Sequence, residues 1–239
     1  PRRLEYTLYW LSVKEFFLDR LMNKIVFDPL KKAGRKLNFI NLKNIFYYFI
    51  PAYIIGIVLL FNEALIPDIV HKNLPILYAL IGLLMVLRSF TERKSPILSW
   101  LLIILNHFWI ALAISFNEHF EWDHLAWYLS GIVICGSLGL VLLNKLRNDE
   151  SNYFDLNTYY GHVYEYPGMA FVFLIVSLGL AGFPITPSFI GEDLIFSHIG
   201  DHQFFLALFN SLGFILGGIS IVRLYARLFM GPHIKTYHE

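Results

Sequence analysis

The chain consists largely of apolar runs of membrane-spanning length, separated by short polar turns. Five windows contain no Asp or Glu. Where such a window contains a basic residue, that residue lies near one end of it. Each window approaches the roughly 20 residues that an α-helix needs to cross the hydrocarbon core of a bilayer. The pattern therefore predicts five transmembrane helices, within residues 44–62, 74–90, 96–116, 124–144 and 203–231.

A sixth apolar run, residues 168–200, is interrupted near its middle. It reads GMAFVFLIVSLGLAG, then FPITPSF, then IGEDLIFSHIG, with Gly182, Pro184 and Pro187 at the interruption. Lipid cannot satisfy free backbone N–H and C=O groups, so irregular backbone at membrane depth persists only inside protein or beside a water-filled cavity. We therefore expect an all-α, polytopic membrane helix bundle of about six spans, one of which is a discontinuous helix.

The composition supports a membrane protein and leaves no room for a soluble catalytic domain. Of the 239 residues, 56% are hydrophobic and 15% are charged, with a mean hydropathy of +0.55, whereas about 25% of the residues in a soluble domain are charged. Residues 1–43 differ, because apolar positions recur there at helical spacing amid Lys, Arg and Asp. They predict an amphipathic interfacial helix, ended or kinked at Asp28-Pro29, and a basic linker.

The basic residues predict the orientation in the membrane. Every one of the 19 Lys and Arg except Lys72 falls on one side if the interrupted run counts as a single crossing. The positive-inside rule then places both termini in the cytoplasm, and we expect a bacterial-type inner membrane. The basic run KKAGRK follows from this topology. The expected partner is therefore the lipid bilayer, and no nucleic acid.

Glu192 is the first candidate functional residue, because it lies in the first turn after the interruption. The positive end of the second half-helix favours its carboxylate form, whereas burial away from water favours the neutral acid. An acid balanced between the two forms suits a proton relay, and an ionisable residue at this depth is a functional-site hypothesis by default. The alternative is that Glu192 and Asp193 cap a helix at the outer interface.

His107 is the second candidate relay, near the centre of the 96–116 window and next to Asn106. Imidazole both accepts and donates a proton, and Asn106 can support it. The alternative is a packed, hydrogen-bonded contact between helices. The sequence contains no Cys/His cluster with metal spacing, P-loop, GxSxG or GxGxxG motif. We therefore expect no metal, no cofactor and no catalytic constellation in this chain.

The interrupted run resembles a known family, the antiporter-like membrane subunits shared by respiratory complex I and Mrp-type cation/proton antiporters. LIVSLGLAGFPITPSFIGEDLIF is similar to its broken-helix signature, in which Glu192 takes the acid-or-lysine position. SIVRLYARLFMGP is similar to its closing helix, and FTERKSPILSWLLIILNHFWIAL to a helix pair in which His107 matches a histidine. The resemblance implies that residues 74–232 form a C-terminal five-helix inverted repeat, and that residues 44–62 are an extra transmembrane helix.

The sequence departs from this family at two points. The helix within 124–144 carries a buried Lys or His in the family, whereas YLSGIVICG offers Ser130 as the nearest polar residue. The other repeat, with its own Lys and Glu, is missing from these residues. The resemblance therefore implies that the missing N-terminal half belongs to a longer polypeptide, or that other membrane subunits supply it.

The function expected on these grounds is a proton- or cation-translocating membrane subunit of a larger ion-transporting or respiratory-type complex. An NADH:quinone oxidoreductase-type translocase would carry the motive chemistry outside this chain. Two alternatives stay open. One is a subunit that couples a proton gradient to inorganic-carbon uptake, with a soluble partner on the cytoplasmic face, for which residues 145–167 are the candidate surface. The other is a structural membrane anchor that conducts nothing.

Overall fold

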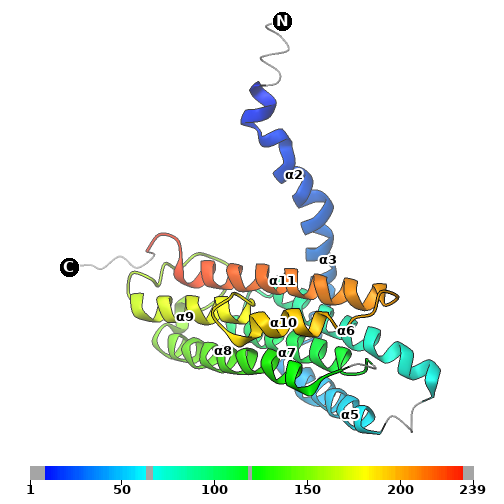
Figure 1. The fold of residues 1–239 in the computed structure, drawn as a ribbon. Coiled ribbons are helices and arrows are strands. Elements are labelled where there is room, and N and C mark those ends of the chain that lie inside the picture. The colour runs from blue at the N-terminus through cyan, green and yellow to red at the C-terminus, as the bar shows by residue number, and fades with distance from the viewer. Residues whose placement is uncertain (1–8, 63–66, 118–119, 234–239) are drawn as a thin grey trace, which may run out of the picture.

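The computed structural model describes residues 9–62, 67–117 and 120–233, and within these ranges the protein is helical, without a strand. Five helices are long and apolar enough to cross a membrane, as the hydrophobic pattern predicted. Figure 1 shows the long helices lying along a common direction. The chain is thus an integral membrane protein with multiple spans. The five comprise a helix through α4 (Leu42–Asn44) and α5 (Ile50–Phe61), then α6 (Asp68–Thr91), α7 (Pro96–Ile114), α8 (Trp122–Asp149) and α11 (Phe204–Phe229).

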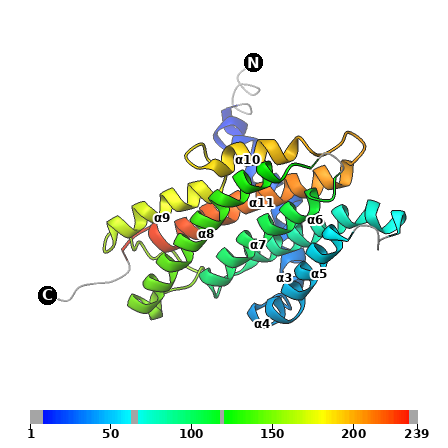
Figure 2. The same ribbon diagram turned by 60° about the horizontal axis from the view of Figure 1, so that its bottom comes forward.

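The sixth apolar run folds as two half-helices, α9 (Pro167–Leu180) and α10 (Pro187–Phe196). Figures 1 and 2 both show them running one after the other along the bundle, so together they make one crossing. The predicted discontinuous helix is therefore confirmed. Pro187 stands at the start of α10, where its missing N–H removes a donor that has no helical partner anyway.

α7 is the central helix of the bundle. The structure buries 72% of its apolar window, against 11% for the span through α5. Trp100 of α7 is fully buried, and its indole N–H donates to the carbonyl of Gly136 on α8 at 2.9 Å. Because a Cβ on Gly139 would overlap the Trp100 ring, glycine is what lets this bulky side chain lie between the two helices.

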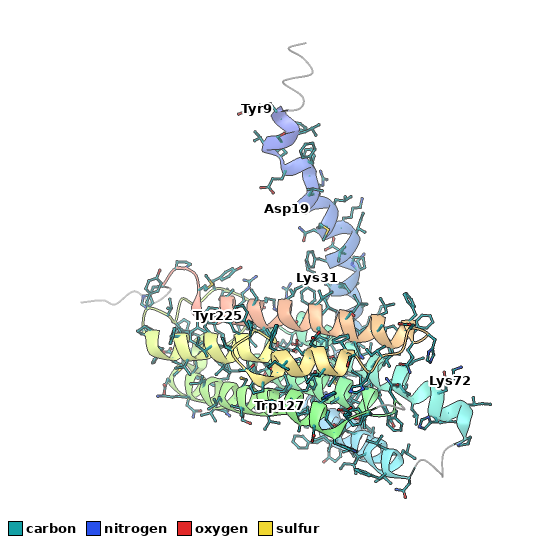
Figure 3. The ribbon with its side chains drawn as sticks, viewed as in Figure 1. Tyr9, Asp19, Lys31, Lys72, Trp127 and Tyr225 are labelled. Atoms are coloured by element: carbon teal, nitrogen blue, oxygen red, sulfur yellow. The ribbon has the colours of Figure 1, made fainter. Side chains whose placement is uncertain are left out.

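Residues 9–36 form an arm that leaves the bundle. Figures 1 and 3 show it crossing the direction of the long helices, with Tyr9, Asp19 and Lys31 spaced along it. A helix with this direction runs along the membrane plane when the bundle spans the bilayer, as expected of an interfacial helix. The arm meets the bundle at Gly34, where a Cβ would overlap Thr91 and the Leu87 carbonyl of α6. Residues 1–8 of the predicted amphipathic segment lie outside the described residues.

The expected end or kink at Asp28-Pro29 is not found, because helix continues through it from α2 (Leu18–Met22) to α3 (Asp28–Lys36). A π turn, Asn23–Phe27, directly precedes Pro29, and a second one, Ile45–Phe49, precedes Pro51. A π turn pairs carbonyls with N–H groups one residue further on, which accommodates a proline that lacks its own N–H. The break in helical geometry comes earlier, at Glu15–Phe17, where φ is 49° to 55°.

The connection between α8 and α9 closes over the C-terminal end of α11. The N–H groups of residues 160–163 donate to the carbonyls of residues 227–230 at 3.0–3.2 Å, so the last carbonyls of α11 are paired. The α6–α7 turn lies at the same end, since Arg223 donates to the carbonyls of Phe90 and Glu92. Lys72 lies at the opposite end of the bundle from Tyr225 (Figure 3).

Hydrogen bonds also hold this connection internally. Asp155 accepts from the Tyr160 hydroxyl at 2.6 Å and from the backbone and side-chain N–H groups of Asn157 at 2.8 and 2.9 Å. Burial raises the pKa of the Asp155 carboxyl group, but these hydrogen bonds outweigh it and leave the pKa below its usual value. The connection is therefore an ordered part of the fold.

Replacement of Gly139 by Val should destabilise the bundle, because the added methyl groups would overlap the rigid Trp100 ring. Overpacking of this kind costs about 1–3 kcal/mol. The matched control is Gly218→Val in α11, where a Cβ meets no atom within 4 Å. Thermal unfolding in detergent should show a lower midpoint for Gly139→Val than for Gly218→Val. Equal midpoints would contradict the packing described here.

Candidate functional site

The first half-helix of the broken span ends in a Schellman motif. Gly182 has a left-handed φ of +71°, its N–H donates to the Gly179 carbonyl at 3.3 Å, and the Phe183 N–H donates to the Leu178 carbonyl at 3.0 Å. This is the two-bond pattern that satisfies carbonyls at a helix C-terminus, and it favours glycine at the left-handed position. Gly182, expected to support the break, is the residue that turns the chain.

Two hydroxyl groups complete the pairing at the break. Ser188 Oγ donates to the Gly179 carbonyl at 2.9 Å, and Thr186 Oγ1 donates to the same oxygen at 3.2 Å. The two hydroxyl oxygens lie 2.6 Å apart. A carbonyl freed by the end of α9 is thus paired with side chains of the same span, as a low-dielectric layer requires.

The Glu192 carboxyl group lies directly against Gly182. A Cβ on Gly182 would overlap this carboxyl group, so the side chain fills the space that the glycine leaves. Glu192 Oε1 is buried and has no hydrogen-bond partner among the described residues. The structure therefore brings the predicted acid and the predicted break into contact, but Glu192 is the sixth residue of α10 and not in its first turn, where it was expected.

Glycines bring α10 close to α8. A Cβ on Gly191 would overlap the backbone of Tyr128, and a Cβ on Gly131 would lie 2.9 Å from Ser188. Glu192 follows Gly191, so it lies on the part of α10 that packs against the Tyr128 backbone. The close packing of small residues thus places the segment that carries the acid beside Tyr128.

Tyr128 also contacts His107, the second predicted relay. The Tyr128 hydroxyl and His107 Nδ1 lie 2.7 Å apart, and both residues are buried, at 0% and 3% exposure. The Phe214 ring of α11 packs against the His107 ring at 5.5 Å between centroids. The contact between Tyr128 and His107 therefore links α8 to α7, next to the α10 segment that carries Glu192.

Asn106 and Asn210 add two fully buried amides, on α7 and α11. Neither amide has a hydrogen-bond partner among the described residues. Asn106 Oδ1 lies against Gly82 of α6 and Gly213 of α11, 3.1 and 3.0 Å from a Cβ placed on each. Buried polar groups are normally paired with protein or with ordered water, so the interior among α6, α7 and α11 has polar character.

Ser130 is not part of this series. Its hydroxyl donates to the Trp127 carbonyl at 2.8 Å, and it shares a shallow surface depression with Asp123 and Trp127. The polar contact of α8 within the bundle comes instead from Tyr128, two positions earlier. Sequence reasoning missed Tyr128 because tyrosine is frequent in this chain, which has 14. Tyr128 could have been found because it lies in the same apolar window as Ser130 and also carries a hydroxyl group.

A bundle of apolar helices with one span interrupted beside a buried carboxyl group defines the class: a polytopic membrane protein with a discontinuous helix. Residues 104–217 match the transmembrane family described as NADH:quinone oxidoreductase/Mrp antiporter. This stretch contains His107, Tyr128 and Glu192. Residues 104–217 thus carry the similarity to the transmembrane region of the complex I and Mrp antiporter family, and the resemblance predicted from the sequence is confirmed over this stretch.

Individual relatives match over shorter stretches. NADH-ubiquinone oxidoreductase chain 4 of Dictyostelium citrinum is 37% identical over 81 residues, which is 34% of this chain and 20% of that protein. NADH-quinone oxidoreductase subunit N of Buchnera aphidicola is 28% identical over 119 residues, or 49% of this chain and 24% of that protein. The matched regions therefore span about a quarter or less of these relatives. No solved structure matches significantly.

Replacement of Gly182 by Ala should destabilise the broken span through both backbone strain and overlap with Glu192. A left-handed φ at a non-glycine residue costs about 1–3 kcal/mol. The matched control is Gly168→Ala, where a Cβ meets nothing within 4 Å. In the double variant Gly182→Ala/Glu192→Ala the overlap disappears, so its loss of unfolding free energy should be smaller than the sum of the single losses. Additive losses would show that the two residues do not touch.

Proposed function

We propose that this chain is a proton-translocating membrane subunit of a larger complex of the NADH:quinone oxidoreductase or Mrp antiporter type, with Glu192 as its relay acid. The observation that carries the proposal is the contact between the Glu192 carboxyl group and Gly182 at the break. A half-buried acid beside an interruption of a membrane helix is costly, and such residues mark ion pathways. An acid that only capped a helix at the interface would not need the space that Gly182 leaves for its carboxyl group.

His107 and Tyr128 form the second relay in this proposal. A phenol hydroxyl and a neutral imidazole both donate and accept hydrogen bonds, so the 2.7 Å contact between them can pass a proton. In this proposal Tyr128 is the bridging group, because it contacts His107 and its backbone packs against Gly191, the neighbour of Glu192. The buried amides of Asn106 and Asn210 extend polar character beyond His107 toward α11.

The names of the relatives support a respiratory-type complex over a subunit for inorganic-carbon uptake. Two of them are named as subunits of NADH oxidoreductases. In this proposal other subunits are partners of the chain, and the driving reaction takes place outside it. A membrane potential of ~100 mV supplies about 2.3 kcal/mol for each elementary charge that crosses. A sodium ion or another cation is the alternative cargo.

The proposed orientation places both termini in the cytoplasm. The supporting observation is that the basic α6–α7 turn and the C-terminal part of α11 meet at one end of the bundle through Arg223, whereas Lys72 lies at the other. The positive-inside rule assigns the basic end to the cytoplasm. The N-terminal and C-terminal basic residues Arg2, Arg3 and Lys235, which the rule also counts, lie outside the described residues.

Replacement of Glu192 by Gln should abolish proton flux, because the amide keeps the shape of the side chain but cannot release a proton at working pH. The matched control is Asp193→Asn, an exposed neighbour that should keep wild-type flux. The measurement is dye-reported acidification of vesicles that contain the full native complex. Unchanged flux in Glu192→Gln would overturn the relay. An absence of flux in every variant and in the wild type would favour the structural anchor.

Replacement of Tyr128 by Phe should reduce flux at least tenfold without unfolding the bundle, because only the bridging hydroxyl is removed; proton transfer by a positioned side chain contributes roughly 10²–10⁴-fold. Tyr53→Phe is the control, since that ring packs against Trp109 through edge-to-face contact at 5.2 Å, which Phe preserves. Wild-type flux in Tyr128→Phe would show that protons pass Glu192 without the His107 branch.

A further inference from the structure

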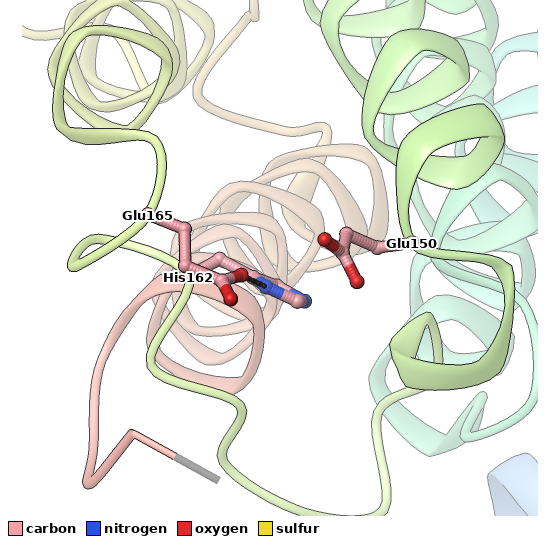
Figure 4. Close-up of side chains that lie close together, drawn as sticks. All are labelled: Glu150, His162 and Glu165. Carbon is pink, nitrogen blue, oxygen red and sulfur yellow. Dashed lines mark ion pairs between the residues drawn. The ribbon is translucent and has the colours of Figure 1, made fainter. Parts of the chain in front are cut away.

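A cluster of two carboxylates and one imidazole lies at the end of the bundle where α8 finishes. Glu150 follows the last residue of α8, and His162 and Glu165 come from the connection to α9. One possible ligand atom from each residue lies within 4.8 Å of the other two. Figure 4 shows the three side chains pointing toward one another. Glu150 and His162 are buried, at 7% and 2% exposure, so this is no solvated acidic surface.

The hydrogen bond of His162 determines what its second nitrogen can do. His162 Nε2 lies 2.9 Å from the Tyr153 carbonyl, which only accepts, so Nε2 carries a hydrogen. A neutral ring then presents a lone pair at Nδ1, which lies 3.5 Å from the Glu165 carboxylate oxygen Oε2. A lone pair facing a carboxylate is repulsive. The repulsion is removed by a proton between the two groups, on the ring or on the carboxyl group, or by a metal ion that both groups bind.

The surroundings match those of a metal ligand set. A metal-binding histidine usually donates its other N–H to a backbone carbonyl, as His162 does to Tyr153. Glu150 is oriented in the same way, because its Oε1 accepts from the Tyr166 hydroxyl at 2.9 Å. The other oxygen of Glu165, Oε1, lies 3.2 Å from His233 Nε2. Ligand atoms about 3.4 Å apart are expected around a tetrahedral Zn²⁺ with bonds of about 2.1 Å.

We propose that Glu150, His162 and Glu165 bind a divalent transition-metal ion, Zn²⁺ in the first instance, with His233 as the fourth ligand. Two carboxylates and two neutral imidazoles around a divalent cation form a buried cluster without net charge. The ion joins the end of α8, the connection that closes over α11, and His233, four positions past the end of α11. It acts as a structural clamp at this end of the bundle, independent of the relay at Glu192.

The proposal extends what the sequence suggested for this region. Residues 145–167 were a candidate surface for a soluble partner, and no metal was expected because the four ligands follow no Cys/His spacing motif. Glu150 lies at the end of α8, and His162 and Glu165 lie in the connection to α9. The chain brings the three together when residues 160–163 pair with the end of α11. The fold, and not a local motif, therefore builds the site.

The test measures metal content in the full native complex, purified from membranes with an affinity tag that contains no histidine. Inductively coupled plasma mass spectrometry should find about one Zn²⁺ per chain in the wild type. Glu165→Gln keeps the size of the side chain and should lose the metal. His202→Ala removes an exposed histidine at another site and should keep it.

A second measurement distinguishes the absence of a site from loss of the ion during purification or misfolding of a variant. After chelation, Co²⁺ is added and the visible absorption of tetrahedral cobalt is recorded. The wild type and His202→Ala should show these bands and a higher thermal midpoint with metal, and Glu165→Gln should show neither. Equal metal binding by Glu165→Gln and the wild type, or no metal in any sample before and after addition, would overturn the site and assign a proton to His162 Nδ1.

Discussion

The hydrogen bonding of the freed backbone at the break is the constraint on which this site depends. A helix that stops within an apolar layer leaves carbonyl groups that lipid cannot satisfy. Here the Gly179 carbonyl accepts from Ser188 and Thr186, and the Gly182 turn pairs the remaining end of α9. Only glycine adopts the Gly182 conformation without strain, and the missing Cβ is what admits the Glu192 carboxyl group. The solution to the backbone problem thus also creates the place for the acid.

Close packing at glycine also brings the segment that carries the acid against its neighbours. α8 and α10 approach until the Tyr128 backbone lies where a Cβ of Gly191 would be, which brings Glu192 beside Tyr128. The Tyr128 hydroxyl then reaches His107 on α7. In a membrane, where apolar side chains gain nothing by leaving lipid, close packing of small residues and interhelical hydrogen bonds hold helices together. Both are present here, and both converge on the residues that could carry a proton.

The spans and the break could be predicted from sequence because each depends on local properties: hydropathy over 20 residues, and Gly182 with two prolines in an apolar run. The pairing of Tyr128 with His107 could not, since they lie 21 residues apart and meet only through the rotation of α8. That rotation also explains Ser130, a polar residue in the right window whose side chain bonds to its own helix. The function of Glu192 stays a prediction, although the structure places it against the break.

The last carbonyl groups of α9 and of α11 are paired in different ways. α9 ends in the middle of its span, whereas α11 ends at the edge of the bundle. The carbonyls of α11 pair with backbone N–H groups of residues 160–163, which an extended connection outside the apolar layer can supply. At the α9 end the chain re-enters α10 within a few residues, and the hydroxyl groups of Thr186 and Ser188 add to the backbone bonds of the Gly182 turn. This fixes the backbone of the break on both sides. The Glu192 side chain differs from this paired backbone, because its Oε1 has no hydrogen-bond partner among the described residues. In the relay proposed above, the Glu192 carboxyl group would therefore reorient while the backbone of the break stays paired.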